Sequence, residues 1–459
     1  MSSGPHVAVV GAGVAGLAAA RALVAAGARV SVLEAGPTVG GKLRTGTLAG
    51  VGVEEGAEQF LVRVPEATDL AAELGFVVVH PVTSTAGVFS RGRLRPLPSG
   101  TLLGIPGDLR ALAACRVLPP LGLARVLLDL VLPRTPRHGD VSVGSLVRAR
   151  VGGAVLDRLV DPLLGEVYAG SADGLSLAMT VPALADSRSR SLVAAARRAA
   201  RSPARTAASA AADAAVFGTV VGGLGGFAAS AAAGLDVACG RPVHALERRG
   251  DGWRLHHGSP HDPATLDVDG LILAVPARPA ARLLGPLVPE AAALTGLGYA
   301  SVALIALAYP PGTALPPGSG FLVPAVERRV VKAATFLSAK WSRPATEPVV
   351  VRCSAGRYGE QAVLRMPDAD LVAAVRRDLA VLASIRAEPL ASRVVRWGGA
   401  LPQYPPGWPD VLARVRAALA AAPPVALAGA AYLGVGIPAC LRSGSAAAAE
   451  LLARLQVTA

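Results

Sequence analysis

The sequence HVAVVGAGVAGLAAARALVAAGARVSVLEAG, residues 6–36, contains the pattern that decides the fold. Residues 6–10 are a short apolar run, as expected for a buried parallel strand. A G-x-G-x-x-G motif occupies residues 11–16, and apolar helix formers continue from it to a glycine that suits a helix end. Residues 29–33 are a second apolar run. This order predicts a strand, a glycine-rich turn, a helix and a second strand.

The three glycines and the acid that ends the second strand have distinct physical roles. Gly11 permits a tight turn, Gly13 lets the backbone approach a pyrophosphate, and Gly16 lets the helix pack closely on the strand. The helix N-terminus offers unpaired N–H groups and a positive dipole end to phosphates. Glu34 is placed to accept hydrogen bonds from ribose hydroxyls. Together these features predict a Rossmann-type dinucleotide-binding domain.

The residues after Glu34 favour FAD over NAD. Gly40, Gly41 and Lys42 offer a second flexible turn with a cation, which suits a ligand that extends beyond one nucleotide. The alternative for these three residues is a surface turn. An NAD domain would normally continue with further βα units, whereas residues 51–60, VGVEEGAEQF, turn into a polar loop.

Composition limits the class of protein. A chain of 459 residues with 52% hydrophobic residues is long enough for two or three domains and is not expected to be disordered. The formal net charge is +13, but only three of the 45 basic residues are lysines and asparagine is absent. This bias is typical of a high-GC genome. Because no RNA-binding signature accompanies the charge, we expect no nucleic-acid partner.

Cysteine usage and the N-terminus favour a cytoplasmic protein. The four cysteines are scattered and form no C-x-x-C motif, so neither a disulfide framework nor a metal site is expected. No basic segment precedes an apolar stretch at the N-terminus, which argues against secretion.

Three uncharged runs are long enough to be tested as membrane spans: residues 1–20, 214–235 and 417–441. Glycines and prolines interrupt them, and a lipid-exposed helix so interrupted would leave backbone groups unsatisfied. We therefore interpret all three as buried segments of a soluble protein. Arg110, Arg116, Arg125 and Arg134 recur among leucines in the region that follows residue 94. They indicate either peripheral contact with a membrane surface or an ordinary solvated face.

The distribution of helical and strand-like patterns indicates one domain interrupted by two others. We predict an FAD-binding domain in three parts, a helical insert that contacts a membrane surface or is simply solvated, and a substrate-binding domain with a mixed sheet. The segments are 1–90 (FAD-binding, first part), 91–215 (helical insert), 216–290 (FAD-binding, second part), 291–394 (substrate-binding) and 395–459 (FAD-binding, C-terminal part).

Over nearly its whole length the chain resembles the FAD-dependent protoporphyrinogen/coproporphyrinogen III oxidase family of haem biosynthesis, within the amine-oxidase-like flavoproteins. The first segment that carries the resemblance is general to the superfamily, while ALPQY and GVGIPACLRSG are narrower. The matching segments are GAGVAGLAAARAL…VLEA…VGGKLRT, EEGAEQFL, RLRPLPSG, DPLLGEVYAG, LSL, GSGFLVP, RWGGALPQY and LAGAAYLGVGIPACLRSG. The resemblance implies the fold of that class: a Rossmann-type FAD-binding domain, a mixed-sheet substrate domain and a helical insert.

The resemblance also implies which residues contact FAD. The Glu58-Gln59 pair stands where the family has an Asp-Ser or similar pair. The expected contacts are Gly11, Ala12, Gly13, Val14, Ala15 and Gly16 at the pyrophosphate; Glu34 and Ala35 at the adenosine ribose; Val243 at adenine; Lys42, Gly56, Ala57, Glu58 and Gln59 on the ribityl and flavin side; Trp397 beside the cofactor; and Val435, Gly436 and Ile437 at the isoalloxazine ring.

The reaction that the resemblance implies is oxidation of a porphyrinogen to a porphyrin, in three hydride transfers to flavin N5, with molecular oxygen as the electron acceptor. We expect Val167, Phe321 and Leu322 to contact the macrocycle or, alternatively, to be ordinary core. Arg91, Arg93 and Arg95 are candidates to pair with propionates. A basic entrance favours coproporphyrinogen III, which carries four propionates, over protoporphyrinogen IX, which carries two. No side chain is identified as an acid or base, and no metal is expected.

Three alternatives remain open from the sequence: a protoporphyrinogen IX oxidase, another amine-oxidase-like flavin oxidase, and a flavin-binding protein without turnover. The expected partners are a porphyrinogen, oxygen and, transiently, the next enzyme of the haem pathway. The expected location is the cytoplasm, with peripheral contact at the inner face of the membrane as an open question.

Overall fold

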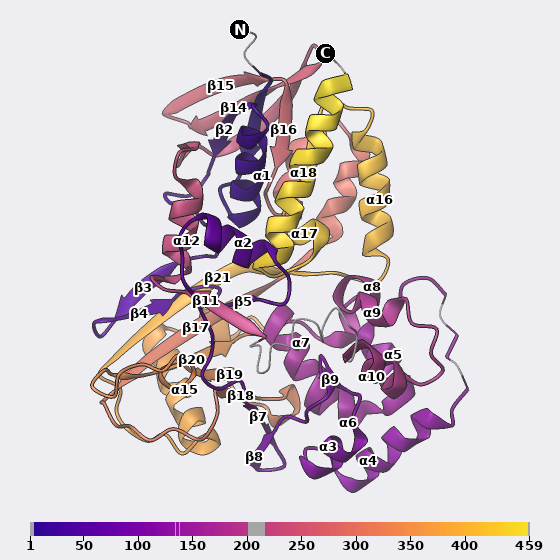
Figure 1. The fold of residues 1–459 in the computed structure, drawn as a ribbon, viewed down its shortest axis with the longest axis vertical. Coiled ribbons are helices and arrows are strands. Elements are labelled where there is room, and N and C mark those ends of the chain that lie inside the picture. Colours follow the sequence, from indigo (N-terminus) through magenta and orange to yellow (C-terminus); the bar gives the residue numbers. More distant parts are fainter. Residues whose placement is uncertain (1–3, 134, 137, 201–215, 458–459) are drawn as a thin grey trace.

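The computed structural model describes residues 4–133, 135–136, 138–200 and 216–457, and the chain folds into three units (Figure 1). A five-stranded parallel sheet and the elements around it form the upper half of the view, the parallel-sheet unit. A seven-stranded sheet with one long helix lies at the lower left, the mixed-sheet unit. Short helices gather at the lower right, the helical unit.

The strands of the parallel-sheet unit come from both ends and from the middle of the chain. Their order is β12-β2-β1-β16-β22, and every neighbouring pair is parallel. This is a doubly wound order, in which ligands bind beyond the carboxyl ends of the strands. The bounds are His6–Val10 (β1), Arg29–Leu33 (β2), Asp236–Ala238 (β12), Gly270–Leu273 (β16) and Val425–Leu427 (β22).

Both faces of this sheet are covered. Val7 and Val9 of β1 pack with α1 and α18, while Ala8 and Val10 belong to the core on the opposite face. Because neither face meets water, the strand is apolar at every position, which explains the continuous run in the sequence. The covering elements are α1 (Val14–Ala25) and α18 (Ile437–Val457) on one face, and β13 (Val243–Arg249), β14 (Gly252–Ser259), β15 (Asp262–Val268), α13 (Ala277–Leu284) and α16 (Trp408–Leu419) on the other.

The mixed-sheet unit is a sheet of order β21-β17-β20-β19-β18-β7-β8, antiparallel except for the β18/β7 pair. Helix α15 (Asp368–Leu382) covers one face with a leucine-rich core. The other face is turned toward the rest of the molecule. The strand bounds are Ala86–Ser90 (β7), Arg93–Pro96 (β8), Gly298–Tyr309 (β17), Gly320–Leu322 (β18), Val331–Phe336 (β19), Val349–Ala355 (β20) and Ala391–Gln403 (β21).

The helical unit is built from short helices divided by prolines and glycines. Its core continues into that of the parallel-sheet unit, so the two are packed together. Its elements are β9 (Thr101–Leu102), β10 (Ile105–Pro106), α3 (Leu109–Ala114), α4 (Pro120–Leu127), η1 (Leu128–Leu130), α5 (Val143–Val151), α6 (Gly153–Val155), η2 (Leu156–Val160), α7 (Asp161–Tyr168), η3 (Ala172–Gly174), α8 (Leu177–Thr180), α9 (Pro182–Ala185) and α10 (Leu192–Ala200).

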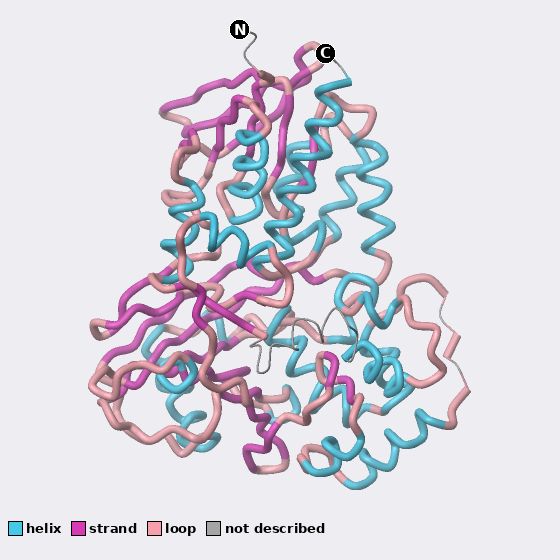
Figure 2. Tube along the Cα trace, viewed as in Figure 1, coloured by secondary structure: helices cyan, strands magenta, loops and turns pink. Residues whose placement is uncertain are grey.

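Short elements join the units, and Figure 2 shows strands and helices meeting at mid-height of the molecule. The β3–β4 hairpin packs on the face of the mixed sheet that α15 does not cover, here called the open face, through Leu48, Val51 and Val53. The remaining elements are β3 (Thr45–Leu48), β4 (Val51–Glu54), β5 (Phe60–Leu61), α2 (Glu66–Glu73), β6 (Val78–Val79), β11 (Phe217–Val220), α12 (Gly223–Ala232), η4 (Pro289–Gly296), η5 (Ala325–Glu327), α14 (Leu337–Lys340), η6 (Val363–Arg365) and α17 (Ala430–Leu433).

Two of the predicted domain boundaries differ from the structure. The boundary at 90/91 falls in the turn between β7 and β8, and both of these strands belong to the mixed sheet. The boundary at 394/395 falls inside β21, which continues to Gln403. The composition of β7 and β8 does not reveal that they join a sheet whose other strands lie far along the chain. In the same way, β21 continues without a break from one unit to the next, so the sequence shows no boundary within it. The last residues of the predicted insert, 201–215, lie outside the described residues.

The C-terminal uncharged run, residues 417–441, is divided among the end of α16, β22, α17 and the start of α18. Residues 216–235 likewise form a strand, a glycine turn and α12. Within the described part of the chain, we find no helix that is both long and apolar enough to cross a membrane.

Candidate cofactor and substrate site

The glycine-rich turn lies at the carboxyl edge of the parallel sheet. Gly11 has a φ of +104° and its N–H donates to the Leu33 carbonyl at 2.8 Å, which holds the turn between β1 and β2. A Cβ on Gly16 would overlap the Gly11 carbonyl oxygen. The first turn of α1, with Val14 and Ala15, therefore starts directly beside the strand end. The predicted close packing at this motif is present in the structure.

Glu34 is fixed next to this turn by the backbone. Its carboxylate accepts hydrogen bonds from the N–H groups of Ala12 and Gly36, both at 2.7 Å. The carboxylate thus lies at the end of β2 with lone pairs that remain for ribose hydroxyls. Ala35 is exposed beside it. The Arg241 N–H donates to the Glu34 carbonyl at 2.8 Å, which brings the start of β13, with Val243, to the same end of the sheet.

The second glycine turn packs against the first. The Gly40 N–H donates to the Ala12 carbonyl at 2.8 Å, and a Cβ on Gly41 would lie 3.3 Å from the Gly13 Cα. Lys42 follows this turn. Its side chain is exposed, and desolvation by nearby protein atoms lowers the pKa of its ammonium.

Helix α18 directs its N-terminus to the same place. A Cβ on Gly444 would overlap the Ala15 carbonyl oxygen, so α18 lies against the start of α1. Gly434 and Gly436 before it have φ values of +134° and +103°, a region that strongly favours glycine. Val435 is partly exposed and Ile437 is buried in the core below α12. Figure 1 shows α1 and α18 side by side.

The residues present fit a large phosphate-bearing cofactor. A Cβ built on Gly13 or on Gly436 would meet no heavy atom within 4 Å, so space is open beside both helix N-termini. Lys42 follows the glycine turn that packs on Gly13, and Glu34 supplies acceptors beside Ala12. A dinucleotide requires donors and positive charge for its phosphates, which two helix N-termini and a cation supply, and an acceptor for its ribose hydroxyls.

The loop Gly56–Gln59 and Trp397 form the other side of this space. The Ala57 N–H donates to the Lys42 carbonyl at 3.1 Å, and Trp397 Nε1 donates to the Glu55 carbonyl at 2.5 Å. A Cβ on Gly56 would lie 3.3 Å from the Trp397 ring. Gln59 Oε1 is buried and has no hydrogen-bond partner among the described residues, which is consistent with an acceptor kept for a bound group.

Glu58 was predicted as a cofactor contact, but its side chain is held by the protein. Its carboxylate receives Lys340 Nζ at 2.5 Å, Arg352 at 3.2 Å and Trp341 Nε1 at 3.2 Å. Burial by itself would raise the pKa of Glu58, but Arg352 and Lys340 hold this pKa below its ordinary value. The carboxylate therefore fixes the loop to the mixed-sheet unit, and only its backbone remains for the cofactor.

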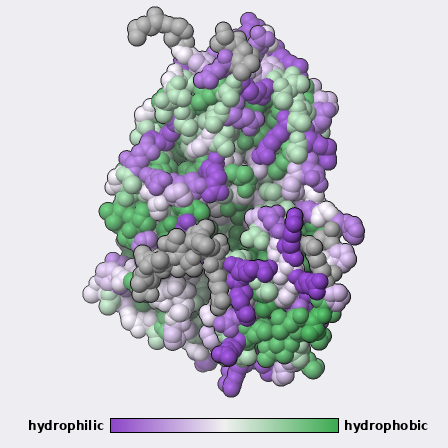
Figure 3. All heavy atoms as spheres, turned by 45° about the vertical axis from the view of Figure 1, so that its right-hand side comes forward, coloured by the Kyte–Doolittle hydropathy of each residue, from purple (hydrophilic) through white to green (hydrophobic). Residues whose placement is uncertain are grey.

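The open face of the mixed sheet continues from this loop. Arg352 of β20 donates to the Gly56 carbonyl at 3.1 Å, and Ser354 lies two residues further along the same face. Leu304 of β17 pairs with Ser354, and Thr335 of β19 pairs with Arg352. Leu304, Thr335 and Arg352 are only partly buried although they lie in the middle of the sheet. This face is not fully covered by protein, and Figure 3 shows the surface hollowed at mid-height.

The three predicted macrocycle contacts lie in different environments. Val167 of α7 is 41% exposed, so it is not ordinary core. Leu322 lies on the face of the sheet turned toward the helical unit. Phe321 points the other way: it is 2% exposed and packs on Phe336 in the core beneath α15. Phe321 is therefore core and does not line the open face, because successive residues of a strand point to opposite faces.

The arginines expected at the entrance lie in and beside the β7–β8 hairpin at the edge of the sheet. Arg91 donates to the Leu118 carbonyl at 3.3 Å and Arg95 to the Ser90 carbonyl at 2.9 Å. Both guanidinium groups thus help to hold the hairpin, while Arg93 is exposed.

The ALPQY segment, singled out by its resemblance, joins units rather than lining the open face. Gln403 Nε2 donates to the Tyr168 carbonyl at 2.5 Å, which fixes β21 to the C-terminal end of α7. Tyr404 is fully buried and its hydroxyl donates to the Ala430 carbonyl. The segment therefore sets how the helical unit and the last glycine-rich turn are placed.

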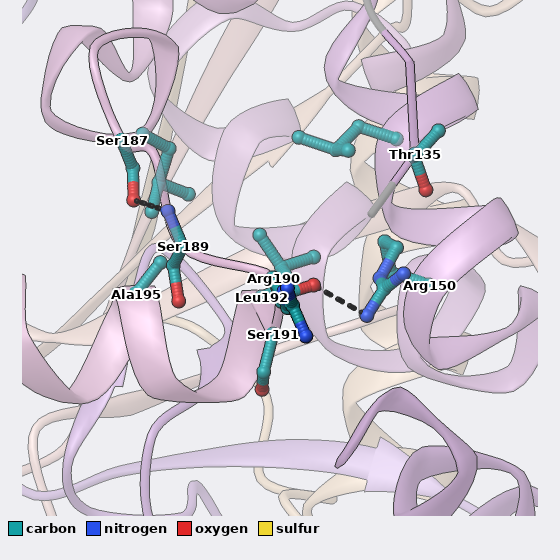
Figure 4. Close-up of a pocket in the computed structure, with 10 residues that line it drawn as sticks. Thr135, Arg150, Ser187, Ser189, Arg190, Ser191, Leu192 and Ala195 are labelled. Carbon is teal, nitrogen blue, oxygen red and sulfur yellow. Dashed lines mark hydrogen bonds between the residues drawn. The ribbon is translucent and has the colours of Figure 1, made fainter. Parts of the chain in front are cut away.

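A separate pocket lies inside the helical unit, between α5 and the start of α10 (Figure 4). Arg150 points into it, but its guanidinium already binds Asp129 and the Arg190 carbonyl. These contacts hold the pocket together, and it lies away from the open space beside the N-termini of α1 and α18. No cluster of three or more His, Cys, Asp or Glu residues in the described part of the chain is arranged to hold a metal ion.

Comparisons with known proteins agree with this geometry. Residues 14–452 match the family described as flavin containing amine oxidoreductase. The chain is 36% identical to a coproporphyrinogen III oxidase of Mycobacterium leprae, over 97% of this chain and 98% of that one. It is 32% identical to a coproporphyrinogen III oxidase of Bacillus subtilis, over 99% and 100%. A crystal structure from Exiguobacterium sp. 255-15, described as a "putative protoporphyrinogen oxidase", superposes with a TM-score of 0.84 at 29% identity, over 98% of each chain. The chain belongs to the flavin containing amine oxidoreductase family, and its relatives include coproporphyrinogen III oxidases.

Proposed function

We propose that this protein is an FAD-dependent oxidase that converts coproporphyrinogen III to coproporphyrin III in haem biosynthesis, with molecular oxygen as electron acceptor. The observation that carries the proposal is full-length similarity to proteins named coproporphyrinogen III oxidase. Support for FAD in particular comes from the hydrogen bonds that link the turn at Ala12, which binds Glu34, to the second turn at Gly40, and Lys42 to the loop at Ala57.

The bound flavin would supply the two-electron oxidation, by accepting a hydride from a methylene-bridge carbon in each of three rounds. The chain's own residues would bind and orient the reactants. Gly13 and the α1 N-terminus would hold the pyrophosphate, and Lys42 would offset its charge. The N-terminus of α18 would stabilise negative charge that develops on the ring during reduction. The open face of the mixed sheet, with Leu304, would lie against the macrocycle.

The choice between two porphyrinogens can be tested by aerobic turnover of the purified FAD-loaded protein. We expect porphyrin fluorescence to appear faster from coproporphyrinogen III than from protoporphyrinogen IX, with hydrogen peroxide formed in step. A preference for protoporphyrinogen IX would overturn the choice of substrate and keep the chemistry. Failure to oxidise either above the uncatalysed rate would refute the proposed function and favour a flavin-binding protein without turnover.

We also propose that the protein is cytoplasmic and makes peripheral contact with the inner face of the membrane through the helical unit. Leu121 is 85% exposed and Val131 is 78% exposed at the two ends of a leucine-rich segment. Figure 3 shows an apolar patch on this lower part of the surface. Arg110 and Arg116 are exposed nearby, whereas Arg125 donates to carbonyls of α5 and Arg134 lies outside the described residues. Transient contact with the next enzyme of the haem pathway would also use an exposed apolar surface flanked by arginines.

Vesicle sedimentation tests the membrane contact. We expect the protein to co-sediment with vesicles that contain anionic lipid, and Leu121→Ser combined with Val131→Ser to reduce the bound fraction at least fivefold, since both exposed side chains lose their apolar area. The matched control is Val77→Ser, which changes a 65% exposed valine elsewhere. Equal sedimentation of both variants would contradict membrane contact through this patch.

A further inference from the structure

Glu166 is an exposed carboxylate on a helix that is otherwise mostly packed. Glu166 and Val167 are the two exposed residues in α7, and their neighbours Gly165 and Tyr168 are buried. The side chain of Glu166 is 39% exposed. Glu166 directly precedes Val167 in the same turn of α7, and Val167 is a residue predicted to contact the macrocycle.

The carboxylate of Glu166 is held from one side only. Ser354 Oγ donates to its Oε2 at 3.2 Å, and the Lys332 ammonium lies 3.7 Å from the same oxygen. Lys332 also donates to the Gly165 carbonyl at 2.9 Å, so it is fixed in place while almost wholly buried. Both described contacts are made to Oε2. A carboxylate has about four acceptor positions, so capacity remains for a further donor.

The sheet places this carboxylate close to the cofactor loop. Ser354, which holds Glu166, and Arg352, which holds Gly56, lie two residues apart on one face of β20. Two strand residues span roughly 7 Å. The partly exposed Leu304 lies beside Ser354 on the neighbouring strand. A macrocycle bound on this face would thus have the flavin loop on one side and Glu166 on the other.

We infer, on the basis of the proposed function, that Glu166 is a catalytic residue that accepts a pyrrole proton while the macrocycle is oxidised. A porphyrinogen presents pyrrole N–H groups, which are donors, and a fixed carboxylate is the acceptor that matches them. Removal of a hydride leaves positive charge on the macrocycle. The anionic carboxylate and the carbonyl end of α7 stabilise that charge.

The step is balanced in each round. The methylene C–H bond breaks and its electron pair leaves with the hydrogen as a hydride, which a bound flavin would accept. In two of the three rounds a pyrrole N–H bond breaks, its electron pair remains in the new conjugated system, and the proton passes to Glu166. The third proton comes from the fourth methylene bridge through tautomerisation of the macrocycle, so that four C–H and two N–H bonds break in all. The carboxyl group then releases the proton to solvent through its exposed side. Lys332 would be a positioning residue, because its ammonium is almost wholly buried and lies 3.7 Å from the Glu166 carboxylate.

The test compares Glu166→Gln with the wild type as FAD-loaded proteins. Glutamine keeps the size and accepts hydrogen bonds but cannot take a proton, so kcat is expected to fall about 100-fold or more. KM and the flavin content are expected to stay within about threefold, because orientation and cofactor binding are unchanged. Glu166→Asp is expected to recover part of the rate. Formate is expected to restore turnover to Glu166→Ala, since a small carboxylate can occupy the vacated position.

The matched control is Glu327→Gln, which removes another partly buried, ion-paired carboxylate at Arg158 and is expected to leave kcat unchanged. A Glu166→Gln variant within threefold of the wild type would overturn the inference and leave the proposed function intact. A slow variant that has lost flavin, or whose Glu166→Ala counterpart does not respond to formate, would instead assign Glu166 a structural role. A wild-type protein without porphyrinogen oxidation would overturn the proposed function and this inference together.

Discussion

A glutamate in place of Gly13 is expected to prevent flavin binding while the chain still folds. Gly13 has a φ of −70° and a ψ of 171°, an extended conformation that any residue adopts. A Cβ there would meet no heavy atom within 4 Å, so the new side chain enters open space without strain. That space is where the pyrophosphate is proposed to lie. The added carboxylate would face two phosphates and would reduce the attraction of the α1 N-terminus for them.

Juxtaposed like charges cost several kcal/mol, and each 1.4 kcal/mol changes a dissociation constant about tenfold. We therefore expect Gly13→Glu to weaken FAD binding at least about 100-fold. The measurement is titration of the apoprotein with FAD by quenching of flavin fluorescence, together with the apoprotein melting temperature, which should not change. Gly296→Glu is the control, because Gly296 is also open to solvent but lies in η4, away from the glycine turns. Stoichiometric flavin in purified Gly13→Glu protein would contradict the placement of the phosphates.

The largest loss of stability is expected for Asp129→Ala in the helical unit. Asp129 has no exposed surface, and its carboxylate receives Arg150 Nε at 2.6 Å, Ser191 Oγ at 2.6 Å and the Val193 N–H at 2.9 Å. Arg150 is itself 3% exposed. Removal of the carboxylate leaves a buried guanidinium without its counter-charge, which costs about 3–5 kcal/mol. The change also frees the start of α10 from η1.

Urea denaturation followed by circular dichroism measures this loss in the free energy of unfolding. The control is Asp267→Ala, which removes the carboxylate of an exposed pair with Arg254 and is expected to cost much less, because solvent screens an exposed pair. A cost for Asp129→Ala as small as that of the control would mean that the buried pair adds little to stability. Flavin content measured on both variants shows whether the loss stays within the helical unit.

Local motifs were predictable from the sequence because the chemistry they serve is local. A pyrophosphate is bound by the backbone of a single turn, so Gly11, Gly13 and Gly16 identify it wherever the remainder of the chain goes. The same holds for Glu34, which follows within the same βαβ unit and accepts from the turn itself. The predictions for Lys42 and for the glycines before α18 rest on similar short patterns, and the structure packs the turn before Lys42 against Gly13 and α18 against the start of α1.

Side chains whose partners lie far along the chain were not predictable. Glu58 is bound by Lys340 and Arg352, which are nearly three hundred positions away, so an acidic residue beside a predicted cofactor loop gave no sign of that pairing. Glu166 gave no catalytic signal either, since its meaning depends on Ser354 and Lys332 from two strands of the mixed sheet.

The sequence by itself determined the dinucleotide-binding unit, the return of the C-terminus to it and the kinship with flavin oxidases. Only the tertiary structure decided which faces are open. Phe321 and Leu322 are adjacent and both apolar, and which of them faces the core beneath α15 depends on the register of β18 with its neighbours. When both faces of a strand are buried, alternation carries no information about which face meets a ligand. Tertiary packing therefore decides which side chains line the site.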